Sequence, residues 1–187
     1  MKAQRDAWFD RFADVRLDQI VCVDEFGAAT NMQRTHGRAA PGERVAACVP
    51  HGHWKCISTV AALTTRGIIA SASFDAATDT ELFVTFVTDV LAPTLAAGQV
   101  VVMDNLAPHK APAVRHAIEA VGCRLMLLPP YSPDFNPIEM AISKVKTVLR
   151  KLARRDVPGL LDGIGRALQA ITHSDATAYI RHSGYVL

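Results

Sequence analysis

The chain of 187 residues lacks several features that mark particular protein classes. It has no apolar run near the ~18 residues that a membrane-spanning helix requires. Its first residues are mixed in charge and lack the apolar stretch of a signal peptide. Internal repeats, low-complexity tracts and long linkers are absent as well. We therefore expect one globular domain of ordinary size that works in the cytoplasm.

Cysteine is scarce and shows no close pairing. The four cysteines are Cys22, Cys48, Cys56 and Cys123, and no two of them are separated by the two to four residues typical of a paired motif. Disulfide frameworks and zinc sites usually need cysteines at short, repeated spacings, so neither is expected. Cys22 and Cys56 fall in predicted strands, where we expect small, buried, apolar side chains.

A large charge of one sign is also missing, since the formal net charge is only +2. The distribution of charge is more informative than its sum. Residues 1–135 hold 12 basic and 14 acidic residues, whereas residues 136–187 hold 8 basic and 4 acidic residues. The positive charge therefore gathers in the last quarter of the chain, as a surface that binds a phosphate backbone would require.

Apolar and β-branched runs predict five strands, and apolar residues at helical spacing predict the helices. We expect the strands over residues 19–24, 53–64, 67–74, 100–104 and 124–128. Helices are expected over residues 3–13, 78–97, 111–121, 136–155 and 160–173, with a shorter one possible afterwards. Residues 27–50, rich in glycine, threonine and arginine, are predicted to form a loop or an irregular hairpin.

The order of these elements indicates the fold class. Three leading strands are followed by alternating helices and strands, which implies a mixed sheet with helices on both faces. The predicted class is therefore α/β, with a five-stranded mixed sheet.

Three acidic residues stand at informative places in this pattern. Asp24 and Asp104 each end an apolar run that predicts a buried strand, and Glu139 begins the helix predicted over residues 136–155. Asp104 and Glu139 are separated by 34 residues. Two aspartates at strand ends and one helical glutamate can converge on divalent metal ions, which phosphodiester chemistry needs.

Cations continue along the helix that carries Glu139. At about 100° per residue, Lys146 and Arg150 lie in line with Glu139, at the border of an apolar stripe. Lys144 and Arg154 lie further around. Such charges usually form a solvated face, but their alignment with Glu139 predicts a track for the DNA backbone. In the loop over residues 27–50, Arg38 is a further candidate for DNA contact, with a solvated loop as the alternative.

Three segments of the chain resemble the signatures of bacterial insertion-sequence transposases of the mariner superfamily. They are VDE at residues 23–25, MDNLAPHK at residues 103–110 and LPPYSPDFNPIE at residues 128–139. The resemblance covers about residues 18–155, and the spacing of the last two acids fits it. These transposases are DDE endonucleases with a ribonuclease-H-like catalytic core.

The resemblance implies a specific active site. In a ribonuclease-H-like sheet, strands one and four are neighbours, so Asp24 and Asp104 would lie side by side. Together with Glu139 they would be the catalytic residues and would hold two Mg²⁺ ions, for which Mn²⁺ can substitute. Asn105 and His109 could hydrogen-bond a metal-bound water or a phosphate, or could only order their loop. The activity implied is cleavage of transposon ends and strand transfer into target DNA.

The resemblance also predicts partners. Full-length relatives carry helix-turn-helix domains before the core, whereas fewer than 20 residues precede the first predicted strand. We therefore expect residues 1–17 to be a helical extension and residues 18–187 to be the catalytic domain, without helix-turn-helix domains. The expected partners are double-stranded DNA, a second copy of the chain on DNA, and a separately encoded helix-turn-helix half. The expected location is the bacterial cytoplasm, at the nucleoid.

Two alternatives stay open. The chain could be another nuclease of the ribonuclease-H-like class, such as an RNA–DNA hybrid nuclease or a junction resolvase. It could also be a noncatalytic remnant that binds DNA or dimerises as a regulator.

Overall fold

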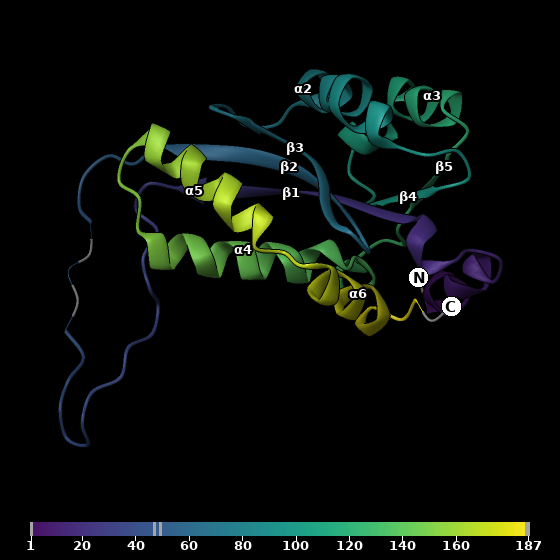
Figure 1. Cartoon of the computed structure of the whole chain (residues 1–187). Helices are drawn as coiled ribbons and strands as arrows, with labels where there is room; N and C mark the ends of the chain where they lie inside the picture. Colours follow the sequence, from purple (N-terminus) through teal and green to yellow (C-terminus); the bar gives the residue numbers. More distant parts are fainter. Residues whose placement is uncertain (1, 47, 49, 186–187) are drawn as a thin grey trace.

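One five-stranded sheet forms the centre of the molecule, a computed structural model that describes residues 2–46, 48 and 50–185 (Figure 1). The strands are β1 Ile20–Ala29, β2 Cys56–Thr64, β3 Gly67–Phe74, β4 Val100–Met103 and β5 Arg124–Leu127. They lie in the order β3-β2-β1-β4-β5. β1 pairs antiparallel with β2 and parallel with β4, so the predicted mixed sheet is confirmed.

Helices cover both faces of this sheet (Figure 1). One face carries α2 Thr80–Thr85, which continues as η3 Phe86–Leu91 and η4 Ala92–Thr94, and α3 Pro112–Ala120. The other face carries α4 Ile138–Leu152, α5 Val157–Gln169 and α6 His173–His182. The short elements are α1 Lys2–Asp6, η1 Phe9–Phe12, η2 Leu17–Gln19, η5 Pro108–Lys110 and η6 Pro133–Phe135. No helix of the described chain is long and apolar enough to cross a membrane.

The sheet separates two apolar cores. Successive side chains of a strand point to opposite faces, so Cys22 joins the core under α4 whereas Val21 and Val23 join the core under α2 and α3. The N-terminal segment belongs to the first core, because Trp8 and Phe12 are buried in it. Residues 2–12 therefore pack as part of the fold, on the same side of the sheet as α4.

Two strand predictions need correction. β1 continues to Ala29, so Asp24 lies within the strand and not at its end. The extra length arises because β2 pairs with β1 as far as Ala29 and Cys56, beyond the point where β4 stops. Cys56 is exposed at the start of β2, contrary to the prediction, whereas Cys22 is buried as expected.

The helix predictions hold in position but not in detail. The helix expected over residues 3–13 is split into α1 and η1, and the one over residues 78–97 passes from α through π to 3₁₀ geometry. α5 begins at Val157, earlier than predicted, because Asp156 caps it by accepting a hydrogen bond of 2.7 Å from the Gly159 amide. Pro158 fits the first turn, where a backbone N–H has no helical partner. The last helix, α6, is present.

The segment of residues 31–46, which follows β1, extends away from the body of the molecule (Figure 1). Its base is tied to the α4–α5 turn, since the Arg155 guanidinium donates to the carbonyl oxygens of Thr30 and Met32 at 2.9 and 2.8 Å. Arg38 lies within this segment and is exposed.

Candidate active site

The register between β1 and β4 brings two of the predicted acids together. Cys22 is paired with Val102, so two residues further along Asp24 is level with Asp104. Side chains two residues apart share a face of a sheet. Both carboxylates are therefore directed to the face covered by α4, whose first turn carries Glu139.

These three carboxylates line one cleft of about 510 Å³. Asp24 comes from the middle of β1, Asp104 follows β4 directly, and Glu139 is an exposed residue at the mouth. The remaining walls come from the loop after β4 and from the proline-rich loop before α4. They are formed by Asn105, Leu106, Lys110, Leu128, Pro129, Pro130, Tyr131, Ser132, Pro133 and Asn136.

Burial makes the Asp24 carboxylate costly to ionise. Its residue is only 8% exposed, and its pKa is raised from 3.8 to about 7, first because of burial and further by the negative charges of Glu139 and Asp104. The backbone N–H of Glu25 donates to Asp24 Oδ1 at 2.8 Å and opposes this rise. A cation between the three carboxylates would remove the penalty.

The donor set fits a divalent metal ion such as Mg²⁺ or Mn²⁺. All three side chains offer carboxylate oxygens, the ligands these ions prefer. The buried Oδ1 of Asn136 lacks a hydrogen-bond partner within the described chain, which leaves a further oxygen free beside Asp24. Among the described residues, however, no three His, Cys, Asp or Glu side chains are close enough to enclose a metal already. The carboxylates are thus gathered at a cleft without forming a closed cage.

Asn136 is a site residue that the sequence analysis missed. Asn136 is the first residue of the helix predicted over residues 136–155, but the helix begins at Ile138, and the Asn136 side chain is buried in the site instead. Its Nδ2 donates to Asp24 Oδ2 at 3.2 Å and to the Val23 carbonyl at 3.4 Å. Asn136 thus ties the loop before α4 to the acid on β1. In the sequence, the only indication of a role in the site was its position two residues before the helix that carries Glu139. A residue that caps a helix occupies the same kind of position.

The two residues predicted to assist the acids have different surroundings. Asn105 lines the cleft. His109 is 1% exposed and does not line it, since its Nδ1 contacts Asp104 Oδ1 and its ring packs 4.2 Å from that of Phe83. The Leu106 amide also donates to Asp104 Oδ1, at 3.2 Å. His109 therefore orients the Asp104 carboxylate from behind.

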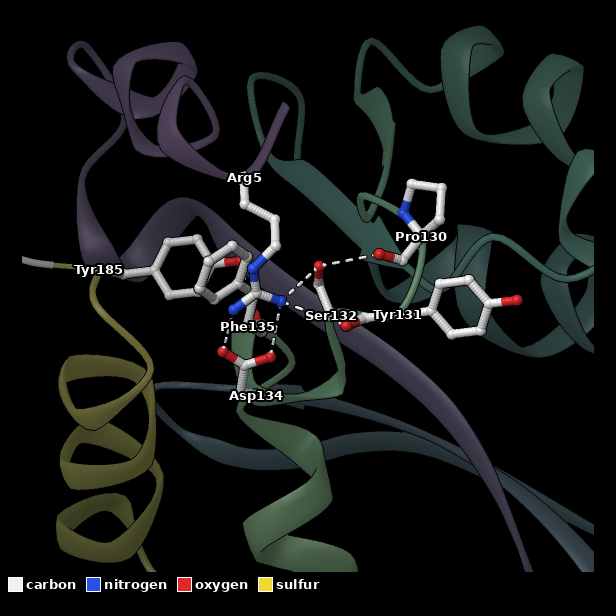
Figure 2. A network of polar contacts seen from close by, with 7 residues as sticks. All are labelled: Arg5, Pro130, Tyr131, Ser132, Asp134, Phe135 and Tyr185. Atoms are coloured by element: carbon white, nitrogen blue, oxygen red, sulfur yellow. Dashed lines mark hydrogen bonds and ion pairs between the residues drawn. The ribbon is translucent and has the colours of Figure 1, made fainter. Parts of the chain in front are cut away.

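The proline-rich loop is fixed from outside by Arg5 of α1 (Figure 2). The Arg5 guanidinium donates to both carboxylate oxygens of Asp134, at 3.0 and 2.6 Å. It also donates to the Tyr131 carbonyl at 3.2 Å and to Ser132 Oγ at 2.7 Å. Asp134 accordingly has a lowered pKa, chiefly because of its hydrogen bonds from Arg5.

Aromatic side chains support the same contact. The Arg5 guanidinium lies 4.2 Å from the centre of the Phe135 ring, and Phe9 packs against Phe135 with ring centres 4.9 Å apart. The Tyr185 hydroxyl donates to the Phe135 carbonyl at 2.9 Å and accepts from the Trp8 indole at 3.2 Å. Both ends of the chain thus hold the loop that positions Asn136 and Glu139.

The predicted DNA-contacting cations fall into two groups. Lys144 pairs with Asp175 at 2.7 Å, and Arg154 lies 3.5 Å from Asp162, so both have protein partners. Lys146 and Arg150 are partly exposed on α4 and form no ion pair with a described residue. Inside the cleft the cation is Lys110, to which the sequence analysis gave no role although it ends the second motif.

Comparisons with known proteins agree with this geometry. Residues 19–158 match the family described as DDE superfamily endonuclease. A comparison with curated protein sequences gives no match. Among solved structures, Mos1 transposase in its paired-end complex with the left transposon end superimposes with a TM-score of 0.76 at 18% identity, over 97% of this chain and 56% of that one.

Two other Mos1 structures are similar in the same way. The pre-cleavage Mos1 transpososome has a TM-score of 0.77 at 16% identity, over 97% of this chain and 57% of that one. The Mos1 transposase catalytic domain with raltegravir and Mn has a TM-score of 0.72 at 15% identity, over 96% of this chain and 85% of that one. The chain therefore spans little more than half the length of the Mos1 chain in the first two structures. The structural similarity confirms the predicted ribonuclease-H-like sheet.

Proposed function

Because this chain belongs to the DDE superfamily endonucleases, we propose that it is the catalytic domain of a DNA transposase. Its proposed activity is metal-dependent cleavage of phosphodiester bonds at transposon ends, followed by transfer of the cut strand into target DNA. The observation that carries the proposal is the meeting of Asp24, Asp104 and Glu139 at one cleft, from three distant segments.

We assign a separate role to each of the main residues of the cleft. Two Mg²⁺ ions, with Mn²⁺ able to substitute, would supply charge stabilisation and a nucleophilic hydroxyl at neutral pH. Asp24, fixed by Asn136 and the Glu25 amide, would hold both. His109 keeps the Asp104 carboxylate in place, and Glu139 stands at the entrance, where a DNA strand arrives. Lys110 would hold a phosphate of that strand by charge.

Double-stranded DNA is the proposed partner, which the Mos1 paired-end complex with the left transposon end supports. Lys146, Arg150 and Arg38 are exposed or partly exposed and are the proposed backbone contacts. Lys144 and Arg154 would first have to exchange a carboxylate for a phosphate. We further propose that the domain acts as a dimer on DNA and that sequence-specific end recognition comes from helix-turn-helix domains outside residues 18–187, with residues 1–17 as an N-terminal extension of the catalytic domain.

A nicking assay tests the catalytic part. Supercoiled plasmid is incubated with the purified chain and Mn²⁺ or Mg²⁺, and with its Asp104→Ala variant. Asp89→Ala is the matched control, since Asp89 is exposed on the opposite layer of the fold. We expect metal-dependent nicks from the wild type and the control only. Nicking that survives in Asp104→Ala would overturn the assignment.

The same assay separates the two alternatives. An RNA–DNA hybrid nuclease would cut a hybrid faster than duplex DNA, whereas the proposed transposase domain would not. A noncatalytic remnant would bind DNA without any nick at either metal.

A further inference from the structure

Tyr131 is an exposed aromatic residue at the rim of the cleft. Its side chain belongs to a residue that is 89% exposed, although it lines the same cleft as the three carboxylates. Within the described chain its ring packs against no other aromatic ring and its hydroxyl forms no hydrogen bond. The ring points away from the Arg5 contacts (Figure 2). A large side chain left open at this place has no role in packing.

The backbone of Tyr131 is strained. Its φ of +55° lies in the left-handed region, which is unfavourable for a residue with a Cβ. Ala153 is the other described residue of this kind, and it ends α4, where the left-handed conformation is a common helix terminator. Tyr131 has no such explanation, and strain of this type gathers at functional sites.

Neighbouring contacts keep Tyr131 in this conformation. Nη1 of the Arg5 guanidinium donates to the Tyr131 carbonyl and to Ser132 Oγ, as well as to Asp134 Oδ1. Ser132 Oγ in turn donates to the Pro130 carbonyl at 3.3 Å. Pro130 and Pro133 restrict the backbone on both sides. These contacts thus fix the backbone from which the exposed Tyr131 ring projects at the cleft.

We propose that Tyr131 is a stacking platform for one base of the DNA strand whose phosphodiester enters the cleft. The inference rests on the proposed function, since it takes that strand to be DNA. Lys110 and the acids act on the backbone, whereas an exposed ring beside them offers a flat apolar face that any base can cover. Leu106, 49% exposed on the other loop of the cleft, adds apolar surface there.

Binding without cleavage tests the proposal. The probe is a fluorescein-labelled 30-base-pair duplex with three unpaired nucleotides at one end, measured by anisotropy without Mg²⁺ or Mn²⁺. Base stacking on an aromatic side chain corresponds to a loss on the order of tenfold in affinity when the ring is removed. We therefore expect Tyr131→Ala to bind about tenfold more weakly and Tyr131→Phe to bind as the wild type does.

Salt dependence separates stacking from charge. Tyr131→Ala should keep the wild-type slope of log affinity against log salt, whereas Lys110→Ala should lower that slope by about one. Binding by Tyr131→Ala within about twofold of the wild type would overturn the proposal. Loss of binding in Tyr131→Phe as large as in Tyr131→Ala would overturn it as well, because the hydroxyl would then be the contact.

Strain gives a second, independent readout. Glycine adopts the left-handed conformation without cost, so Tyr131→Gly should melt about 2–4 °C above Tyr131→Ala while binding DNA as weakly. Equal melting temperatures would show that Tyr131 is not held under strain. If Tyr131→Ala changes the sedimentation of the chain but not DNA binding, the ring contacts protein, and stacking is overturned.

The two proposals fail in different ways. A wild type that binds the probe but never nicks with Mn²⁺ contradicts the proposed activity, and the Tyr131 variants still decide on stacking. A wild type that nicks while Tyr131→Ala binds and nicks equally well contradicts stacking alone.

Discussion

The two sides of the cleft are built in different ways. Asp24 and Asp104 lie on neighbouring parallel strands, and the hydrogen bonds between β1 and β4 alone set them level. Glu139 lies on the first turn of α4, and its place depends on the loop before that helix. The loop is fixed by Arg5, more than 120 residues away in the sequence. One side is positioned by backbone pairing and the other by long-range side-chain contacts.

This difference predicts which substitutions the site should tolerate. A strand inside a sheet cannot shift without breaking its hydrogen bonds, and a one-residue slip of β1 or β4 would turn the aspartate of that strand away from α4. A loop held by a few side-chain contacts can move when one of them, such as the Arg5 guanidinium, is lost, with the sheet intact. Changes on the strand side should therefore abolish function, and changes on the loop side should reduce it by degrees.

The largest expected effect is that of Asp24→Asn on catalysis. The substitution keeps the size of the side chain but removes the charge that would hold metal, so metal-dependent nicking should fall by more than about 100-fold, beyond the usual loss for residues that only support a ligand. Plasmid nicking rates at saturating Mn²⁺ measure this. Asp18→Asn, at an exposed ion pair with Arg16, is the control and should nick normally.

Arg5→Ala should have an intermediate effect. Losing the hydrogen bonds to Tyr131, Ser132 and Asp134 frees the loop, so nicking should fall about tenfold, while Mn²⁺ is bound more weakly in titrations without DNA. Arg16→Ala removes a similar two-bond pair, with Asp18, that lies outside the site and should leave both readouts unchanged.

A double variant sharpens this test. If Arg5 acts through Asp134, then Arg5→Ala combined with Asp134→Ala should lose no more activity than either change alone. Fully additive losses would show that Arg5 supports the site by another route. A fall in melting temperature that matches the fall in activity would mean that Arg5 only stabilises the fold.

Asp24→Asn should also raise the free energy of unfolding of the metal-free protein, because the raised pKa of Asp24 shows that its charged form is unfavourable in the fold. In the folded protein the pKa of the Asp24 carboxyl is raised from 3.8 to about 7. Its favourable contribution to the free energy of unfolding is therefore fully present below pH 4 and is lost as pH rises through 7. Asparagine does not titrate. In EDTA the variant should therefore gain about 2 kcal/mol over the wild type at pH 8 and much less at pH 4.

Urea unfolding at the two pH values measures this gain. Added Mn²⁺ should stabilise the wild type and leave Asp24→Asn unchanged, since only the wild type keeps the carboxylate. An equal difference at pH 4 and pH 8 would show that Asp24 ionises as an exposed aspartate does.

The strand side of the site could be predicted from the sequence, because buried strands leave a continuous apolar pattern. The runs before Asp24 and Asp104 predicted both strands, the resemblance implied that the two acids lie side by side, and the comparison confirms the fold class. The sequence did not show that β1 continues past Asp24. That extension depends on its partner β2, which supplies hydrogen bonds as far as Ala29.

The loop side could not be predicted, because its contacts join distant segments. Nothing in the sequence pattern pairs Arg5 with Asp134 or Tyr185 with Phe135. Asn136 shows the same limit at short range, since a polar residue before a helix is usually a cap and here bonds Asp24. Local sequence patterns predict the helices and strands. The position of the loop before α4 depends instead on contacts from residues near both ends of the chain.

The smallest expected effects concern the cations of α4. Lys146 and Arg150 follow Glu139 along the helix without an ion pair to a described residue, so Lys146→Ala should weaken DNA binding modestly and lower the salt slope by about one. Lys144 is paired with Asp175, whose pKa is lowered chiefly by that hydrogen bond. Lys144→Ala should therefore leave DNA binding unchanged and slightly lower the melting temperature. Anisotropy at several salt concentrations compares the two variants, and equal slopes would place both lysines on the same DNA track.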